Sequence, residues 1–598
     1  MPQPPIVRKI TKIDTIHGDV RTDHYHWLRE KSSKDVLSYL EAENAYTQEM
    51  MKPAGKLEET VYKEILTRTK LTDLSVPYRL GNYFYYTRIE EGKQYPVRCR
   101  KKGSLEAPEE VLLELNELAV GHQFLSLGLF RATDDGNLLA YALDTTGFRE
   151  YQIFVKDLTS GRLLADSLGQ VSSAVWALDN KTLFYIREDE AKRPYRLYRH
   201  RLGEDPTKDV LLYEETDALY RLWVYRSSDR KYVILMSGSS ITNEARFLPS
   251  DRPDSPLRLF LARDEGHEYD LDHRGGFFYL RTNKGAKNFR VVRVASDRTT
   301  FNEWEEFIPH RESVKIEDVS LFRHHAVIAE REDGLIRLNV HDFRTGVSRA
   351  IPFPEPVYSA FPGNNPEYET TVFRYSYQSF ITPSSVFDYD MDTAAIKLMK
   401  QTEVLGGYDP SAYASERIWA IAKDGARVPI SLVYKRGVAR DGANPTILYG
   451  YGAYGISIPV GFSIPRLSFL DRGGVYALAH IRGGGDLGEQ WREDGRMMKK
   501  KNTFTDFIAS AEHLIAERYT SPDHLAIQGG SAGGLLIGAV LNMRPDLFKA
   551  AHMAVPFVDI VNTMLDESLP LTVGEFLEWG NPKEKDAYEY MRSYCPYT

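Results

Sequence analysis

The chain has 598 residues, of which 42% are hydrophobic and 27% are charged, and its formal net charge is −8. This length exceeds what one hydrophobic core usually supports, so we expect at least two domains. The acidic balance argues against nucleic acid or an anionic membrane as a partner.

Targeting signals and cysteines narrow the class further. No apolar run has the length of a transmembrane helix, and prolines occupy the amino-terminal positions where a signal peptide needs an apolar core. Cys99 and Cys595 are too few and too far apart for a disulfide framework. This usage favours the cytoplasm and is also compatible with the periplasm.

Residues 1–74 are predicted to form a helical segment that packs on a catalytic domain. From about Asp23 to Lys70, apolar residues such as Val36 and Leu40 recur at spacings of three and four, with charged residues between them. His24 and His26 are isolated from other residues at metal-ligand spacing, so they are not predicted to bind a metal. We expect neither a metal nor another cofactor in this protein.

Seven similar strands recur over residues 75–404, spaced by roughly 44 to 55 residues, which is in the range for four-stranded propeller blades. This pattern predicts an all-β, seven-bladed propeller. Two stacked sandwiches are the alternative, but they would not require seven similar units. The strand centres are Tyr83–Tyr86, Leu138–Tyr141, Leu183–Ile186, Tyr232–Leu235, Phe277–Leu280, Ala326–Ala329 and Thr371–Arg374.

Residues 405–598 have a different pattern, in which strands alternate with helices. After a hairpin around Asp424–Gly425, strands are predicted at Thr446–Tyr449 and Val475–His480, and a helix at Thr503–Ala516. This alternation predicts a doubly wound, mostly parallel sheet that is covered on both faces.

The segment Gln528–Gly534 has the form of a nucleophile elbow, G-x-S-x-G, between an apolar strand and a helix. The turn residue Ser531 would be strained, so Gly529 and Gly533 are needed for their lack of a Cβ. Ser531 would project at the carboxyl end of the strand, and the N–H of Ala532 could face an oxyanion. A tightly packed turn without chemistry is the alternative, which the strand-to-helix context disfavours.

Two further glycine-rich loops, Tyr449–Gly455 and Arg482–Gly488, follow earlier strands of the same sheet. Ligands bind at the carboxyl ends of the strands in doubly wound sheets, so we expect both loops to converge on Ser531. Neither loop has the glycine spacing of a phosphate-binding loop.

These motifs, in this order, resemble the prolyl oligopeptidase family of serine peptidases, and within it the oligopeptidase B group. The resemblance also includes Lys499–Phe504 and Gly574–Pro582 and extends over essentially the whole chain. It implies an α/β-hydrolase domain with a seven-bladed propeller, and an enzyme that cleaves short peptides after Arg or Lys. The propeller would exclude folded proteins. The oligomeric state, monomer or dimer, is left open.

Matching positions carry over the roles of individual residues. The resemblance implies that Ser531 is the nucleophile, and that Tyr451 and the N–H of Ala532 form the oxyanion hole. It implies that Glu575 binds the basic side chain before the scissile bond and that Phe557 stacks on this side chain.

The composition around Glu575 agrees with this role. From Pro556 to Gly580 the chain has five acidic residues and neither Lys nor Arg. A fixed carboxylate beside a planar aromatic ring suits a guanidinium group, through paired hydrogen bonds and stacking.

The sequence departs from the family pattern at the specificity residues. Leu577 stands where the oligopeptidase B group usually has a second glutamate, so we expect one charge fewer in the pocket. Pro459 and Gly461 stand where some members have aspartates credited with binding a second basic residue. A preference for dibasic sequences is therefore not expected.

The largest departure concerns the catalytic triad, whose order in this fold is Ser, Asp, His. His552 is the sole histidine after Ser531, and it lies in the apolar run Ala550–Val555, so it is expected to be structural. The triad Asp and His would then lie beyond Thr598, and residues 1–598 would be nearly inert. The alternatives are a proline-specific oligopeptidase of the same family and a non-catalytic propeller that binds peptides.

Overall fold

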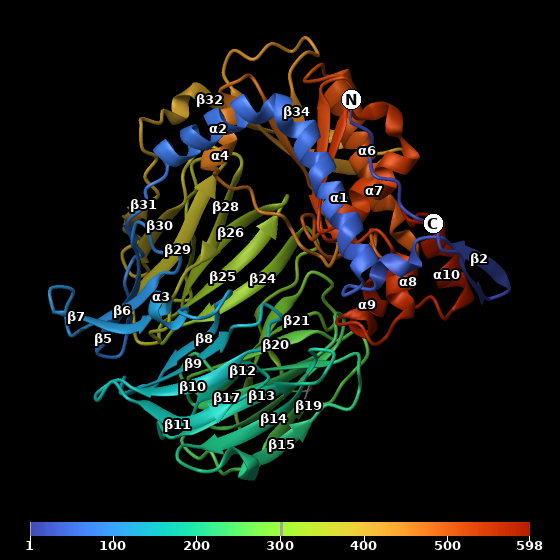
Figure 1. Cartoon of the computed structure of the whole chain (residues 1–598). Coiled ribbons are helices and arrows are strands. Elements are labelled where there is room, and N and C mark those ends of the chain that lie inside the picture. Colours follow the sequence, from blue (N-terminus) through green and yellow to red (C-terminus); the bar gives the residue numbers. More distant parts are fainter. Residues whose placement is uncertain (1, 299–302) are drawn as a thin grey trace. The chain divides into compact units, whose positions relative to one another are not determined.

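The computed structural model describes residues 2–298 and 303–598 (Figure 1). Their contacts divide the chain into two compact units. The first comprises the chain up to Thr69 with the segments 404–408 and 464–468, and the second comprises the remaining residues.

The first unit combines a hairpin with two helices. Strands β1 (Lys12–Ile16) and β2 (Asp19–Asp23) pair antiparallel around His17 and Gly18, which both have positive φ as a tight hairpin turn requires. Helices α1 (Lys34–Met51) and α2 (Gly55–Arg68) follow. The prediction of helix from Asp23 onward was therefore wrong in part: Asp23 ends β2, His26–Arg29 forms only a short 3-10 helix, and the first α-helix begins at Lys34.

Seven antiparallel sheets follow in the described residues, each made of strands that are consecutive in the sequence (Figure 1). The first three blades contain β3 (Asp73–Leu74), β4 (Tyr78–Leu80), β5 (Tyr83–Ile89), β6 (Val97–Lys102) and β7 (Glu109–Glu114); β8 (Ser126–Ala132), β9 (Leu138–Asp144), β10 (Gln152–Asp157) and β11 (Leu163–Leu168); and β12 (Val171–Trp176), β13 (Thr182–Glu188), β14 (Pro194–Arg201) and β15 (Val210–Glu214). The fourth and fifth blades contain β16 (Arg221–Arg226), β17 (Tyr232–Gly238), β18 (Asn243–Pro249) and β19 (Arg258–Leu261); and β20 (Tyr269–Arg274), β21 (Phe277–Thr282), β22 (Arg290–Ala295) and β23 (Glu305–Ile308). The sixth and seventh contain β24 (Val314–Leu321), β25 (His325–Glu332), β26 (Leu335–Asp342) and β27 (Ser348–Ala350); and β28 (Tyr358–Pro362), β29 (Val372–Ser379), β30 (Ser385–Asp390) and β31 (Ile396–Gln401).

The repeat predicted from the sequence corresponds to one position in the blades. Six of the seven predicted centres fall in the second strand of their sheet, although Thr371 lies one residue before β29. The centre Tyr83–Tyr86 falls in β5, the third strand of the first blade in the sequence and the second in its pairing order. Buried side chains then join neighbouring blades: Phe247 in the fourth blade packs edge-on against Phe278 in the fifth, with ring centroids 5.0 Å apart. The seven-bladed propeller is confirmed.

The sheet of the hydrolase domain contains six strands in the order β32-β33-β35-β34-β36-β37. Pairing is antiparallel between β32, β33 and β35 and parallel from β35 to β37. The strands are β32 (Tyr413–Ile421), β33 (Arg427–Lys435), β34 (Thr446–Tyr449), β35 (Val475–Ala479), β36 (Leu525–Gly530) and β37 (Ala550–Ala554). The helices are α4 (Ile464–Leu470), α5 (Glu489–Glu493), α6 (Lys501–Ala516), α7 (Ala532–Met543), α8 (Ile560–Leu565), α9 (Thr572–Trp579) and α10 (Lys585–Arg592).

The edge strand β37 differs from the expectation of a sheet covered on both faces. All five of its residues are exposed, whereas Leu525 and Ile527 of β36 are almost completely buried. In the described residues β37 pairs only with β36, so its outer edge is not paired with another strand. An exposed edge of this kind favours association with other strands.

Candidate active site

The nucleophile elbow has the predicted backbone. Strand β36 ends at Gly530 and α7 begins at Ala532, so Ser531 alone makes the turn, with φ 54° and ψ −121°. Positive φ is rare for a residue with a side chain and marks a position held by its surroundings. The Ser531 side chain is exposed, and its N–H donates to Ala554 O of β37 at 3.0 Å.

The glycines around Ser531 are required by close backbone packing. A Cβ atom at Gly529 would lie 2.3 Å from Gly533 O, and one at Gly533 would lie 2.8 Å from Gly450 O. The second contact joins the elbow to the loop that carries Tyr451. These glycines therefore bring Ser531 and that loop together.

Tyr451 follows β34, which pairs in parallel with β36 so that Tyr449 lies opposite Gln528. Burial raises the pKa of Tyr451, and a hydrogen bond with the Ser531 side chain partly offsets this rise. Ala532 is the first residue of α7, a position whose N–H has no partner within the helix. A phenol O–H and a backbone N–H are thus available beside the serine.

The second glycine-rich loop supports the first. A Cβ atom at Gly483 would lie 2.2 Å from Gly452 O, and Gly455 N–H donates to Gly483 O at 2.9 Å. Arg482 is buried and makes paired hydrogen bonds with the Asp506 carboxylate, at 2.8 and 2.6 Å. In the described contacts, the Arg482–Gly488 loop therefore reaches Ser531 only through the Tyr451 loop. It places no side chain of its own beside the serine.

Glu575 lies on α9 and is fixed by two hydrogen bonds. Its Oε2 accepts the Tyr454 phenol at 3.1 Å and the Trp579 indole N–H at 2.8 Å. Trp579 is four residues after Glu575, which places both on one face of the helix. Burial raises the pKa of Glu575, an effect that these two hydrogen bonds partly counter.

Phe557 connects this acidic group to the serine. Its N–H donates to Ser531 O at 3.1 Å, and its ring centroid lies 5.6 Å from that of Trp579. The structure therefore brings together all the residues singled out by the sequence: Ser531, Ala532, Tyr451, Phe557 and Glu575. Aromatic rings and one oriented carboxylate form the side of the site next to the nucleophile.

Three neighbours of this site were not assigned a role by the sequence. Tyr454 and Trp579 hold Glu575, and Glu578 is only 2% exposed and accepts the Tyr454 N–H at 3.0 Å. The spacing of four residues between Glu575 and Trp579 is a signal that could have suggested their pairing. Tyr454 is distant in sequence from α9, so nothing local indicated its contact.

The three specificity positions that depart from the family pattern do not gain a charge from elsewhere in the described contacts. Leu577 is partly buried on α9. A Cβ atom at Gly461 would meet the Gln378 side chain of β29 at 3.2 Å, and Pro459 borders a cavity of about 20 Å³.

His552 does not contact the serine in the described residues. It lies on β37 opposite Gln528, and its Nδ1 is 3.2 Å from the Gln528 side-chain nitrogen. The side chain is exposed, although its apolar neighbours in the sequence suggested burial, because β37 is at the edge of the sheet.

A second serine has the hydrogen-bond pattern of a catalytic triad. Ser431 Oγ lies 2.8 Å from His480 Nε2, and His480 Nδ1 lies 2.9 Å from Asp486 Oδ1. Ser431 is 2% exposed, and the cavity that it borders has a volume of about 20 Å³, room for one water molecule. No peptide can reach Ser431, so this chain of hydrogen bonds joins β33 to the end of β35 without catalysing a reaction.

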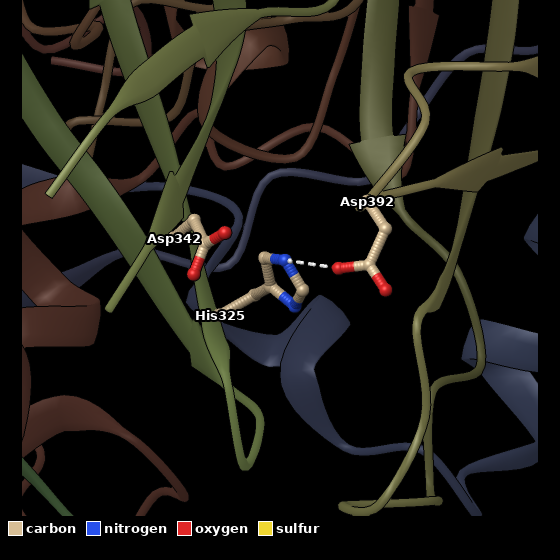
Figure 2. Close-up of side chains that lie close together, drawn as sticks. All are labelled: His325, Asp342 and Asp392. Carbon is tan, nitrogen blue, oxygen red and sulfur yellow. Dashed lines mark ion pairs between the residues drawn. The ribbon is translucent and has the colours of Figure 1, made fainter. Parts of the chain in front are cut away.

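One group of potential metal ligands occurs in the described part of the chain, at His325, Asp342 and Asp392 (Figure 2). Arg344 lies among them and donates to Asp342 at 2.9 Å and also to Asp392. Its guanidinium lowers the pKa of Asp342 to about 2. The positive charge that a metal would supply is thus already provided by Arg344, and the cluster is an ion-pair network between the sixth and seventh blades.

Comparison with known proteins agrees with the arrangement of the fold. Residues 4–402 match the model "Prolyl oligopeptidase, N-terminal beta-propeller domain", and residues 460–598 match the model "Prolyl oligopeptidase family". None of the described helices is long and apolar enough to cross a membrane.

Similar proteins include dipeptidyl aminopeptidase BI from Pseudoxanthomonas mexicana, which is 41% identical over 99% of this chain and 85% of that protein. Protease 2 from Moraxella lacunata is 40% identical over 99% of this chain and 86% of that protein. The structure of oligopeptidase B from Leishmania major has a TM-score of 0.94 and 35% identity, and the match covers 99% of this chain and 88% of that one.

Proposed function

The chain belongs to the prolyl oligopeptidase family of serine peptidases, and we propose that it cleaves short peptides after arginine or lysine. The observation that carries this proposal is Glu575, a carboxylate fixed by Tyr454 and Trp579. The Trp579 ring packs against that of Phe557, whose N–H donates to Ser531 O. An oriented carboxylate with an aromatic ring beside it is suited to a guanidinium group. Arginine should therefore be preferred over lysine.

In the proposed reaction Ser531 Oγ attacks the carbonyl carbon of the scissile bond and loses its proton to a base. The negative charge that develops on the carbonyl oxygen is stabilised by the Tyr451 O–H and the Ala532 N–H. The C–N bond then breaks, the amine leaves with the proton from the base, and Ser531 is acylated. Water hydrolyses the acyl-enzyme in the same way and regenerates the serine.

The base in this reaction is not supplied by a described residue near Ser531. His552 is turned toward Gln528, and His480 is committed to Ser431 and Asp486. We therefore propose that the triad Asp and His lie beyond Thr598 and that residues 1–598 alone are nearly inert. We refer to residues 1–598 joined to a segment that carries the triad Asp and His as the full-length enzyme.

A strong preference for two consecutive basic residues is not part of the proposal. Gly461 and Pro459 carry no charge, and the side chain nearest to a Cβ at Gly461 would be the uncharged Gln378. Glu578 cannot replace the charge that Leu577 lacks, because it is buried and bonded to the Tyr454 backbone. Adding a second basic residue to a substrate should thus change cleavage only slightly.

A substrate panel tests the proposal. Fluorogenic peptides with Arg, Lys, Pro or norleucine before the scissile bond would be compared on the full-length enzyme, each with a free and an acetylated amino terminus. We expect the order Arg, Lys, then the two neutral residues. A preference for Pro would instead support a proline-specific enzyme, and cleavage of only free-amino dipeptide substrates would support the activity that the Pseudoxanthomonas relative is named for. Peptide binding without any cleavage would support a non-catalytic propeller module.

A further inference from the structure

The run Lys499–Lys501 contains one lysine that the proposed chemistry does not use. Lys499 is exposed and pairs with Asp494 at 2.7 Å, whereas Lys500, at the start of α6, is only 1% exposed. A lysine is almost never buried this completely without a partner of opposite charge. The contacts of Lys500 therefore require an explanation.

Lys500 contacts the two halves of the candidate site. Its Nζ donates to Gly452 O at 2.5 Å and lies 4.7 Å from the centre of the Trp579 ring. A cation over an indole ring is stabilised by the ring's charge distribution, most strongly when water is excluded. In the described residues Lys500 forms no ion pair, although the buried Glu578 attracts it electrostatically.

These two contacts reach the groups proposed for catalysis and specificity. Gly452 is adjacent to Tyr451 in the loop that supplies the phenol, and its carbonyl is the acceptor for Lys500. Trp579 donates its indole N–H to Glu575. A single ammonium group thus holds both the loop beside Ser531 and the ring that orients the specificity carboxylate.

We propose that Lys500 is a positioning residue that fixes the Tyr451 loop and Trp579 in one arrangement and so couples the oxyanion hole to the basic-residue pocket. The assignment rests on the proposed function for the pocket, but the link to Tyr451 would serve any acyl transfer at Ser531. Small displacements of a catalytic group can lower turnover about 100-fold. Loss of the ammonium group should thus affect turnover of every substrate.

The pH at which Lys500 loses its proton provides a second, independent test of its positioning role. Burial lowers its pKa to about 8, so the ammonium is lost over a pH range in which an exposed lysine keeps its proton. Ionisable groups on the surrounding elements include Glu575 and Glu578 on α9, Tyr451 and Tyr454 on the loop, Arg496, which donates to Leu577 O of α9, and Tyr590 of α10, which accepts the Lys501 N–H. Burial raises the pKa of all three tyrosines, so they stay neutral near pH 8.

The test compares Lys500→Met with the control Lys499→Met in the full-length enzyme, using an arginine substrate and a norleucine substrate. For Lys500→Met we expect kcat to fall about 10- to 100-fold on both substrates and KM to rise only for the arginine substrate. Lys499→Met should match the parent enzyme. Circular dichroism and melting curves would establish that the variants are folded.

The pH profile separates positioning from a general structural effect. In the parent enzyme kcat for the norleucine substrate should decline as pH rises through about 8, and in Lys500→Met this decline should be absent. If Lys500→Met folds poorly, the pH profile of kcat in the parent enzyme is sufficient as a test. A kcat that stays constant up to pH 9.5 would overturn the proposal. Unchanged kcat in a folded Lys500→Met would overturn it as well.

A failure of the proposed specificity would give a different result. In that case the parent enzyme would cleave the arginine and norleucine substrates equally well, while Lys500→Met would still lower kcat on both. The two ideas can thus fail separately.

Discussion

Replacement of Glu575 by glutamine isolates the charge in the specificity pocket. Glutamine keeps the size of the side chain and one oxygen acceptor, so the Tyr454 phenol and the Trp579 indole can still donate to it. The variant therefore removes the negative charge and leaves the aromatic wall with Phe557 in place. Its effect should be specific for ligands with a positive charge.

The expected loss of arginine affinity can be estimated from the exposure of Glu575, which is half-buried. At an effective dielectric constant of about 20, two opposite charges 4 Å apart attract by about 4 kcal/mol. Desolvation of the guanidinium offsets part of this attraction, and hydrogen bonds to charged groups contribute a net 1.5–3 kcal/mol or so. We thus expect Glu575→Gln to weaken arginine binding by about 10- to 150-fold.

Calorimetry on residues 1–598 measures this effect without requiring catalysis. The ligands would be one short peptide ending in arginine amide and the same peptide ending in norleucine amide. The control Glu567→Gln removes an exposed carboxylate that pairs with Lys583, and it should change neither affinity. Equal losses for the two peptides in Glu575→Gln, or less than a threefold loss for arginine, would refute the assignment of the pocket.

The pH dependence gives an additional check on the same residue. Burial raises the pKa of Glu575 above the ordinary range of a glutamate. The carboxylate is therefore protonated, and loses its charge, at a higher pH than an exposed glutamate would. Arginine affinity should fall as the pH is lowered through this raised pKa, and Glu575→Gln should not show that fall.

Three further predictions concern the nucleophile and its support. Tyr451→Phe should lower kcat of the full-length enzyme about 100-fold with little change in KM, as measured by steady-state kinetics. A variant with the same kcat as the parent would show that Tyr451 is not part of the oxyanion hole. Lys500 loses its proton near pH 8 in the native state and near 10.5 when unfolded, so stability should rise with pH across that window by at most about 3 kcal/mol. Urea titrations at several pH values should show this rise in the parent and not in Lys500→Met. Residues 1–598 alone should show no labelling of Ser531 by a fluorophosphonate above background, and labelling at the rate of an active serine hydrolase would mean that another base is present.

The sequence predicted most of the architecture because both domains repeat simple local rules. Six of the seven predicted strand centres lie in the second strand of a blade and the other lies in β5 of the first blade, and these strands are rich in buried residues. The elbow was likewise predicted from its glycines, because a Cβ at Gly529 or Gly533 would lie only 2.3 or 2.8 Å from a backbone oxygen. Both signals can be recognised from short runs of residues, although the close approach at Gly533 is to Gly450 of a distant loop.

What the sequence did not indicate depends on contacts between distant segments. Lys500 is one of three consecutive lysines, and only the packing of α6 against Gly452 and Trp579 distinguishes it from its exposed neighbour Lys499. Tyr454 reaches α9 across more than a hundred residues of sequence. The β1–β2 hairpin was missed because its strands are short and rich in charged residues.

The buried Ser431–His480–Asp486 chain has a practical use. Because the adjoining cavity holds about one water molecule, an electrophilic probe can meet Ser431 only after the residues that line this cavity, such as Ser457–Val460, move apart. Modification of Ser431 would thus report how often this region opens locally, much as slow amide hydrogen exchange does. Ser431, which resembles a catalytic serine by its hydrogen bonds, can therefore serve as a probe of local opening in the hydrolase domain.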